Sequence, residues 1–272
     1  MEIGLQHLIL KESKSNQKNL TLSVSTNFIS LSIRDFVSNS LLMFDKKIFN
    51  KPVSDEYISE ELKKILDSNA IDNQKFDSVK LIQENDFFVL VPDELYSESD
   101  KKTYLRYNTE TREDDFVAVD NLNNLKIKNV YIPYVNVNNF LIDLYNNIEY
   151  YHYNTEFLNK AHEIRTNEKF FAHIDNGKVK IAVFKKDSLV FFNSFEVENA
   201  SDIIYYILLT LKEQDFEIEK TKITYIIDHN YDDLTNISDN FFNNYKILDK
   251  DDNVDFLHAW WELLEEIKDE NG

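Results

Sequence analysis

Residues 170–195 have the pattern of three short strands in a meander, and the rest of the chain can be interpreted against this stretch. Strand-like alternation runs along residues 170–175 and again along residues 178–183. Asn176-Gly177 lies between them and is the strongest two-residue hairpin signal, because both central residues of a type I′ turn need positive φ. A turn at residues 185–188 leads to a third strand. Ser201 then begins an apolar helix, and residues 223–227 form a further strand. The pattern predicts a β-β-β-α-β unit.

The same order of elements occurs near the N-terminus. A shift of 150 residues places Ser25-Thr26-Asn27 on Asp175-Asn176-Gly177, and Asn, like Gly, tolerates the left-handed turn conformation. The two stretches match in pattern and share little sequence identity, so coincidence is the alternative to duplication. The expected elements are strands at residues 20–25, 29–33 and 41–44, a helix capped by Ser54, and strands at residues 79–82 and 87–91.

We therefore expect an α/β protein of two halves, residues 1–150 and residues 151–272. The first half also has the pattern of additional strands and helices after residue 92. A helix at residues 157–164 is expected to lead into the second half. The second half ends in a predicted amphipathic helix whose apolar residues are Phe256, Trp260, Leu263, Leu264 and Ile267.

Composition limits the class of protein. The 30 basic and 49 acidic residues give a net charge of −19, which opposes binding to phosphate backbones and to anionic lipid. The absence of cysteine excludes disulfides, thiolate metal sites and cysteine nucleophiles. The N-terminal sequence lacks the basic and apolar regions of a signal peptide, and no apolar run reaches the length of a membrane span. We expect a cytoplasmic protein without a nucleic-acid or membrane partner.

Glycine is scarce, with Gly4, Gly177 and Gly272 the only three in the chain. Phosphate sites lined by backbone need several glycines, so that the chain can approach the anion closely. Neither a Walker loop nor a dinucleotide-binding fingerprint is present.

One motif resembles a known family. Asn193-Ser194-Phe195, followed by Asp202 and Tyr205-Tyr206, is similar to a Bacteroidetes family of proteins of unknown function with an actin-like ATPase fold. More distantly, the chain resembles pilus-assembly and cell-division actin homologues. The resemblance covers most of the chain and is firmest between Val130 and Asp228. It implies two ribonuclease-H-like β-β-β-α-β halves that face a cleft, and it implies no particular activity.

The resemblance also indicates where a nucleotide would bind. In actin-like ATPases, an Asp-x-Gly turn in each half binds the phosphates and magnesium-bound water. Asp175-Asn176-Gly177 matches this turn, whereas Ser25-Thr26-Asn27 lacks both the carboxylate and the glycine. Asp228-His229-Asn230 stands where the adenosine-side loop usually has a pair of glycines. We expect no cofactor, with ATP and Mg²⁺ as the alternative.

A second set of residues suggests a metal site. In a ribonuclease-H-like half the first and fourth strands are parallel neighbours, so Asp175 and Asp228 could share a divalent ion and support phosphoryl transfer. The simpler interpretation is two strand-end residues that face solvent, and the net charge opposes a nucleic-acid substrate. His173 is expected to be a half-buried, hydrogen-bonded residue. We assign no catalytic residue.

Taken together, these patterns predict an actin-like protein without ATPase activity that binds or scaffolds another protein. One alternative is a nucleotide-binding or hydrolysing enzyme that uses Asp175. A further alternative is a divalent-metal phosphoryl-transfer enzyme that uses Asp175 and Asp228.

Overall fold

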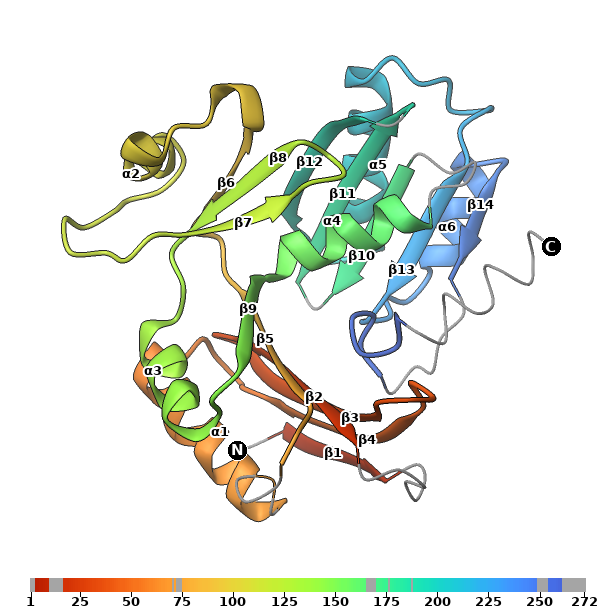
Figure 1. The fold of residues 1–272 in the computed structure, drawn as a ribbon. Helices are drawn as coiled ribbons and strands as arrows, with labels where there is room; N and C mark the ends of the chain where they lie inside the picture. Colours follow the sequence, from red (N-terminus) through yellow and green to blue (C-terminus); the bar gives the residue numbers. More distant parts are fainter. Residues whose placement is uncertain are drawn as a thin grey trace. The chain divides into compact units, whose positions relative to one another are not determined.

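The computed structural model describes residues 3–9, 17–69, 71, 75–164, 170–175, 177–186, 188–248 and 254–260, with only the backbone for residues 3–9. The chain forms two compact units, residues 1–157 and residues 158–272, each of which has a sheet of its own (Figure 1). The predicted boundary between residues 150 and 151 falls inside a strand of the first unit.

The first unit contains a six-stranded sheet in the order β1-β4-β3-β2-β5-β9. Neighbouring strands from β1 to β2 are antiparallel, whereas β2, β5 and β9 are parallel. The strands are β1 (Ile3–Ile9), β2 (Lys18–Ser25), β3 (Phe28–Asp35), β4 (Leu41–Ile48), β5 (Ser78–Glu84) and β9 (Ile148–His152).

Two helices, α1 (Asp55–Ser68) and α3 (Val135–Leu144), pack against this sheet, and their apolar side chains share one hydrophobic core with it. The Ser54 side chain accepts a hydrogen bond from the Tyr57 N–H, which confirms the predicted N-cap. The buried face of α1 carries Ile58, Leu62, Ile65 and Leu66 at helical spacing, and these side chains join Leu22 and Leu31 of the sheet in one core.

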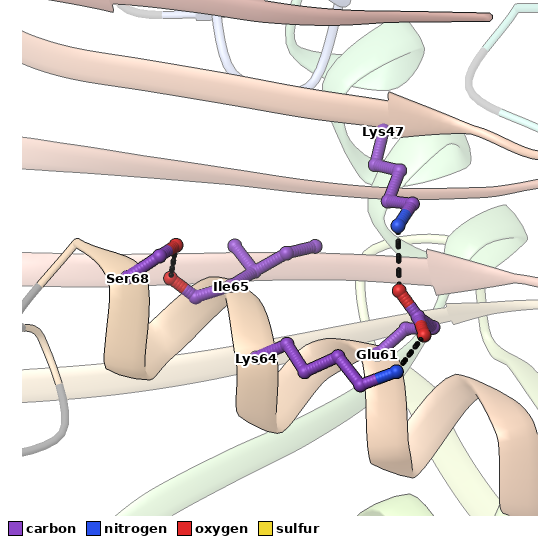
Figure 2. A network of polar contacts seen from close by, with 5 residues as sticks. All are labelled: Lys47, Glu61, Lys64, Ile65 and Ser68. Carbon is purple, nitrogen blue, oxygen red and sulfur yellow. Dashed lines mark hydrogen bonds and ion pairs between the residues drawn. The ribbon is translucent and has the colours of Figure 1, made fainter. Parts of the chain in front are cut away.

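A charged group also holds α1 to the sheet. Glu61 accepts a hydrogen bond from Lys47 of β4 at 2.5 Å and another from Lys64 one turn along the helix (Figure 2). The Glu61 side chain is 3 % exposed, whereas that of Lys64 is 67 % exposed. Burial opposes ionisation of Glu61, but the two lysines outweigh it and hold its pKa below the usual value.

Between β5 and α3 the chain forms a smaller, antiparallel sheet in the order β6-β8-β7. Val91, Leu105, Val117 and Val130 are buried together in its core. The elements of this insert are β6 (Phe88–Pro92), the short 3-10 helices η1 (Asp93–Leu95) and η2 (Glu98–Asp100), α2 (Lys101–Arg106), β7 (Ala118–Leu122) and β8 (Ile127–Tyr131).

Helix α4 (Tyr153–Glu163) leads into the second unit, which has a five-stranded sheet in the order β12-β11-β10-β13-β14. Here β12, β11 and β10 are antiparallel, and β10, β13 and β14 are parallel. The elements are β10 (Phe170–Asp175), β11 (Lys178–Lys185), β12 (Ser188–Glu196), α5 (Ala200–Glu213), β13 (Ile223–Ile227), α6 (Leu234–Phe241) and β14 (Tyr245–Ile247).

The central hairpins of the two units share one register. Leu22 pairs with Leu31 in the first unit, and Ala172 pairs with Ile181 in the second, as the shift of 150 residues predicts. Strands β4-β3-β2-β5-β9 therefore match β12-β11-β10-β13-β14 in order and direction. That the repeat arose by duplication stays a prediction.

Some local predictions were wrong. Helix α5 begins at Ala200, one residue before Ser201, and its N-cap is Asn199. The Asn199 side chain and the Asp202 side chain form a capping box, which satisfies two N–H groups reciprocally and so places the start of the helix before Ser201. Strand β1, helix α6 and strand β14 were not predicted. Of the predicted C-terminal helix, Leu263, Leu264 and Ile267 lie outside the described residues.

Candidate functional site

The candidate site lies where strands β10 and β13 end. These strands are parallel neighbours in which Ile174 pairs with Ile227. Asp175 and Asp228 therefore both lie at the carboxyl ends of the strands. Ligands of open α/β sheets bind at the carboxyl ends of the strands. The fold thus brings together the two acidic residues that the sequence analysis selected.

A tyrosine closes the turn after β10. Gly177 has a φ of +76°, in the left-handed region predicted for it, while Asn176 lies outside the described residues. The Gly177 N–H donates to the Tyr231 hydroxyl at 2.8 Å, and this hydroxyl donates to the Asp175 carbonyl at 3.4 Å. Burial raises the pKa of Tyr231, so the hydroxyl stays protonated at neutral pH. The glycine N–H that would approach a phosphate already has a partner.

The Asp228 carboxylate points into the unit. One oxygen accepts from the His173 Nε2 at 2.8 Å, the other accepts from the Phe256 N–H at 2.8 Å, and the side chain is 3 % exposed. The simpler interpretation of a solvent-facing strand-end residue was therefore wrong for Asp228, because a buried histidine and a backbone N–H form hydrogen bonds with its carboxyl group inside the unit. His173 is hydrogen-bonded as expected, but it is fully buried rather than half-buried.

The divalent-metal site at Asp175 and Asp228 stays a prediction. Asp175 is partly exposed at the end of β10, whereas both oxygens of Asp228 already accept hydrogen bonds. In the part of the chain that the structure describes, no group of three or more His, Cys, Asp or Glu side chains could hold a metal ion.

The corresponding turn of the first unit is closed in a different way. The Ser25 Oγ accepts from the N–H groups of Asn27 and Phe28, both at 3.0 Å. Asn27 does not have the positive φ that the comparison with Gly177 suggested, because the serine side chain stabilises another turn conformation. The Thr26 and Asn27 carbonyls accept from the N–H groups of Val53 and Phe49, respectively.

A second tyrosine completes this turn. The Tyr134 hydroxyl donates to the Glu84 carbonyl at 2.8 Å and also has a hydrogen bond with the backbone of Thr26. Burial raises the pKa of Tyr134, and the bond with Thr26 only partly opposes this effect. Both tyrosines were missed by the sequence analysis. The available signal was their position, since each precedes the helix that leads to the last strand of its unit, α3 before β9 and α6 before β14.

A pocket of about 630 Å³ lies beside the turn between β10 and β11 in the second unit. It is formed by residues at the ends of β13 and β14 and at the start of α6, and its lining includes Tyr231 and three aspartates, Asp228, Asp232 and Asp233. The exposed Asp232 and Asp233 carboxylates, unlike the inward-pointing Asp228 carboxylate, repel a triphosphate in this position.

The motif that suggested a family joins β12 to α5. The Phe195 ring of β12 stacks on the Tyr206 ring of α5 with centroids 4.2 Å apart, and Tyr205 meets Tyr206 edge to face. Asp202 accepts hydrogen bonds from the N–H groups of Glu198 and Asn199 and so fixes the turn between the two elements. The motif has a structural role.

A separate buried polar cluster lies in the first unit. Asp120 of β7 accepts from the His152 N–H at 2.7 Å, the Thr155 hydroxyl at 2.8 Å and the Tyr131 hydroxyl at 3.2 Å. Burial nevertheless raises the pKa of Asp120 to about 6. The sequence analysis did not select this residue, because an isolated Asp in a short strand has no distinguishing spacing.

Comparison with known proteins supports one fold. The model of a family described as "Protein of unknown function (DUF3822)" matches residues 9–245. A crystal structure from Bacteroides thetaiotaomicron, of a protein with an actin-like ATPase fold and unknown function, aligns with a TM-score of 0.75 and 20 % identity over 92 % of this chain and 97 % of that chain. No curated protein matches the sequence.

Two further solved structures are more distant. A chain of the PilM–PilN type IV pilus biogenesis complex aligns with a TM-score of 0.54 and 10 % identity, covering 92 % of this chain and 98 % of that chain. The ethanolamine utilization protein EutJ from Carboxydothermus hydrogenoformans aligns with a TM-score of 0.50 and 9 % identity, covering 94 % and 91 %. The chain has the actin-like ATPase fold. Among its described helices, none has the length and apolar character needed to cross a membrane.

Proposed function

This chain belongs to the DUF3822 family of proteins of unknown function, and from that premise we propose that it binds or scaffolds another protein and does not hydrolyse ATP. The observation that carries the proposal is the state of the two turns. N–H groups of the turn between β2 and β3 in the first unit, and of the turn between β10 and β11 in the second, are hydrogen-bonded to side chains of the chain itself.

Charge and space favour the same proposal. A triphosphate needs backbone N–H groups, a metal and usually a lysine to offset about four negative charges. Here the Tyr231 hydroxyl accepts a hydrogen bond from the Gly177 N–H, and the Ser25 hydroxyl accepts hydrogen bonds from two N–H groups of the other turn. Aspartates line the neighbouring pocket. The proposal requires no cofactor, and ATP with Mg²⁺ is the alternative that it opposes.

The partner is proposed to be a protein. The structurally similar chain from the PilM–PilN complex works in an assembly with another protein, which is the kind of role proposed here. The net charge of −19 makes nucleic acid and anionic membrane poor partners. The proposal includes a cytoplasmic location, which suits a chain without cysteine.

Calorimetric titration with ATP and Mg²⁺, paired with a phosphate-release assay, tests the nucleotide part. We expect no binding tighter than about 100 μM, on the scale where 1 mM corresponds to about −4.1 kcal/mol. Tighter binding or turnover would overturn the proposal. Tyr231→Phe and Tyr134→Phe should raise ATP affinity because they free N–H groups, whereas Tyr245→Phe, whose hydroxyl binds Asp239 away from the turns, should not. Equal ATP affinities of all three variants would show that the tyrosine hydrogen bonds are not the cause of weak ATP binding.

A thermal-shift titration tests the metal alternative. We expect neither Mg²⁺ nor Mn²⁺ to raise the melting temperature, since a ligand stabilises only if it binds the native state. A clear shift that Asp175→Asn abolishes would favour the phosphoryl-transfer enzyme.

Crosslinking in native cells, followed by reconstitution with the purified partner, tests the binding role. The proposal predicts a complex that forms from the two pure proteins without nucleotide. Failure of every crosslinked candidate to bind the pure chain would contradict it.

A further inference from the structure

The insert between β5 and α3 is joined to the rest of the first unit by two chain segments that lie side by side. The chain enters the insert past Asn85 and Phe87 and leaves it at Ile132. The Ile132 N–H donates a hydrogen bond to the Phe87 carbonyl at 3.0 Å, and the Asn85 side-chain amide donates to the Ile132 carbonyl at 2.9 Å. Among the described strands, β6, β7 and β8 pair only with each other. A body attached in this way can rotate about its attachment with few changes of backbone angle.

The sheet of the insert has two faces of different character. One face packs with α2 in the insert's own apolar core, which includes Val130 of the central strand β8. Side chains alternate along a strand, so the neighbouring Asn129 lies on the opposite face. Asp120 of β7 pairs with Asn129 across the sheet and therefore lies on that face too. The apolar core of the insert thus does not depend on what covers its polar face.

The polar face of the insert contacts the end of β9 and the start of α4. Asp120 accepts hydrogen bonds from the His152 N–H at 2.7 Å and from the Thr155 hydroxyl at 2.8 Å. The Asn129 side-chain amide donates to the Thr155 Oγ1 at 3.0 Å. Two aromatic rings of the insert lie beside the His152 ring, with centroids 5.0 and 5.2 Å away, those of Tyr131 and Phe88. These contacts close the insert onto β9 and α4.

The closed contact buries polar groups at a cost in free energy. Asn129 is fully buried, and its Oδ1 has no hydrogen-bond partner among the described residues. Burial also raises the pKa of Asp120, because the ionised carboxylate is less stable here than in water. Water would hydrate both groups if the polar face were uncovered. This gain lowers the free energy that is needed to open the insert.

We propose that the insert swings open as one body about its attachment, with the hydrogen bonds of Asp120 to His152 and Thr155 as the latch. In the open form the insert keeps its sheet and its apolar core, while its polar face and the start of α4 meet water. The six-stranded sheet stays folded throughout, since its strands pair with no described strand of the insert. The motion is independent of the proposed function.

Single cysteines test the opening, and a chain without cysteine gives no background labelling. Asn129→Cys and Thr155→Cys place thiols on the two sides of the latch, at positions that are 0 % and 1 % exposed. Val130→Cys, one residue along β8, places a thiol on the opposite face, and Ser23→Cys places one in the six-stranded sheet. The reaction of each folded variant with a thiol reagent is measured across urea concentrations and compared with its rate in the unfolded chain.

We expect the two latch thiols to react at similar rates, about tenfold or more faster than the thiols of Val130→Cys and Ser23→Cys. Their rates should also depend only weakly on urea, because opening exposes less surface than unfolding. Equal rates at Asn129→Cys and Val130→Cys would mean that the insert unfolds instead of rotating. Fast reaction of Thr155→Cys alone would mean that only α4 frays, and slow reaction of both latch thiols would mean that nothing opens. Each of these three results would overturn the proposal.

Hydrogen exchange tests the same opening in a chain without an added cysteine. In the wild type, the His152 amide should exchange faster than the amides of β8 after correction for their intrinsic rates. Asp120→Asn removes the buried charge but keeps an oxygen acceptor, so it should slow exchange at His152 by about tenfold or more. Asp143→Asn, an exposed substitution on α3, should leave that exchange unchanged. Unchanged or faster exchange in Asp120→Asn would show that Asp120 is not the latch and would overturn the proposal.

Discussion

At the scale of single residues, hydroxyl groups determine which backbone atoms of the turns are available. The Tyr231 hydroxyl satisfies the Gly177 N–H in a partly buried position. We expect Tyr231→Phe to lower the free energy of unfolding by about 1 kcal/mol, the usual net worth of one hydrogen bond. Hydrogen exchange at the Gly177 amide should also become faster. Urea denaturation and amide exchange measure the two effects, with Tyr245→Phe, which removes an exposed hydrogen bond to Asp239, as the control. Unchanged exchange at Gly177 would contradict this assignment.

The raised pKa of Asp120 should be visible in the pH dependence of the free energy of unfolding. Its pKa is raised from 3.8 to about 6, mainly by burial and further by the charge of Glu156, against the three hydrogen bonds that it accepts. Because the folded pKa is above the unfolded one, the stabilising effect of protonation is complete below about pH 3.8 and is lost as the pH rises through about 6. We expect Asp120 to lower the free energy of unfolding by about 3 kcal/mol between these limits.

Asp120→Asn isolates this contribution. Chemical denaturation from about pH 4 to pH 7 should show a flatter profile for Asp120→Asn than for wild type. Asp143→Asn, an exposed substitution on α3, should leave the wild-type profile unchanged. Parallel profiles for Asp120→Asn and wild type would show that Asp120 does not titrate in this range.

At the scale of elements, one carboxylate of α1, shared by two lysines, adds to the apolar contacts that hold this helix to the sheet (Figure 2). Glu61→Gln removes a buried charge partner from Lys47, whose side chain is 13 % exposed, and should destabilise the protein by about 3 kcal/mol. Lys64→Met should cost no more than about 0.5 kcal/mol, because that lysine is exposed. Equilibrium denaturation measures both. Similar effects of the two substitutions would contradict a buried pair between Lys47 and Glu61.

A double substitution separates geometry from charge. Glu61→Leu with Lys47→Met replaces the ion pair by apolar side chains and should recover most of the stability that Glu61→Gln loses, because no buried charge is left unpaired.

Elements with local signals were the predictable ones. The hairpins of β2–β3 and β10–β11 have alternating side chains and short turns, and both formed in the expected register. Helix α6 and strand β14 lie in a stretch rich in Asn and Asp, where few apolar residues define a period. Helix α6 also starts after Asp233 in the left-handed conformation, without a side-chain cap. Tertiary packing of Leu234 and Phe242 decides this region, and a single sequence does not contain that information.

The candidate site was less predictable than the fold. The position of Asp175 and Asp228 at the carboxyl ends of neighbouring strands could be predicted from the topology alone. The direction of the Asp228 carboxylate did not, because it depends on His173 and on Phe256, a residue 28 positions further along the chain. Tyr134 and Tyr231 were missed for the same reason, since their hydroxyl groups meet turns that are distant in sequence.

At the scale of the whole molecule, two compact units with separate cores predict two thermal transitions. Leu62→Ala in the first core and Ile207→Ala in the second should each cost about 2–5 kcal/mol, and each should lower a different transition. Differential scanning calorimetry measures both. One transition that both substitutions shift equally would show that the units unfold together.

The parallel pairing of β5 with β9 has a consequence for synthesis. Strand β5 ends at Glu84 and its neighbour β9 begins at Ile148, with the whole insert and α3 between them. A ribosome adds roughly 5–20 residues per second, so the β5 edge is without this neighbour for several seconds after β5 itself has been made. An open edge of buried, apolar residues such as Leu81 and Ile82 is prone to aggregate. Slow synthesis of the insert therefore lengthens the time during which the nascent first unit can aggregate through β5 before β9 arrives.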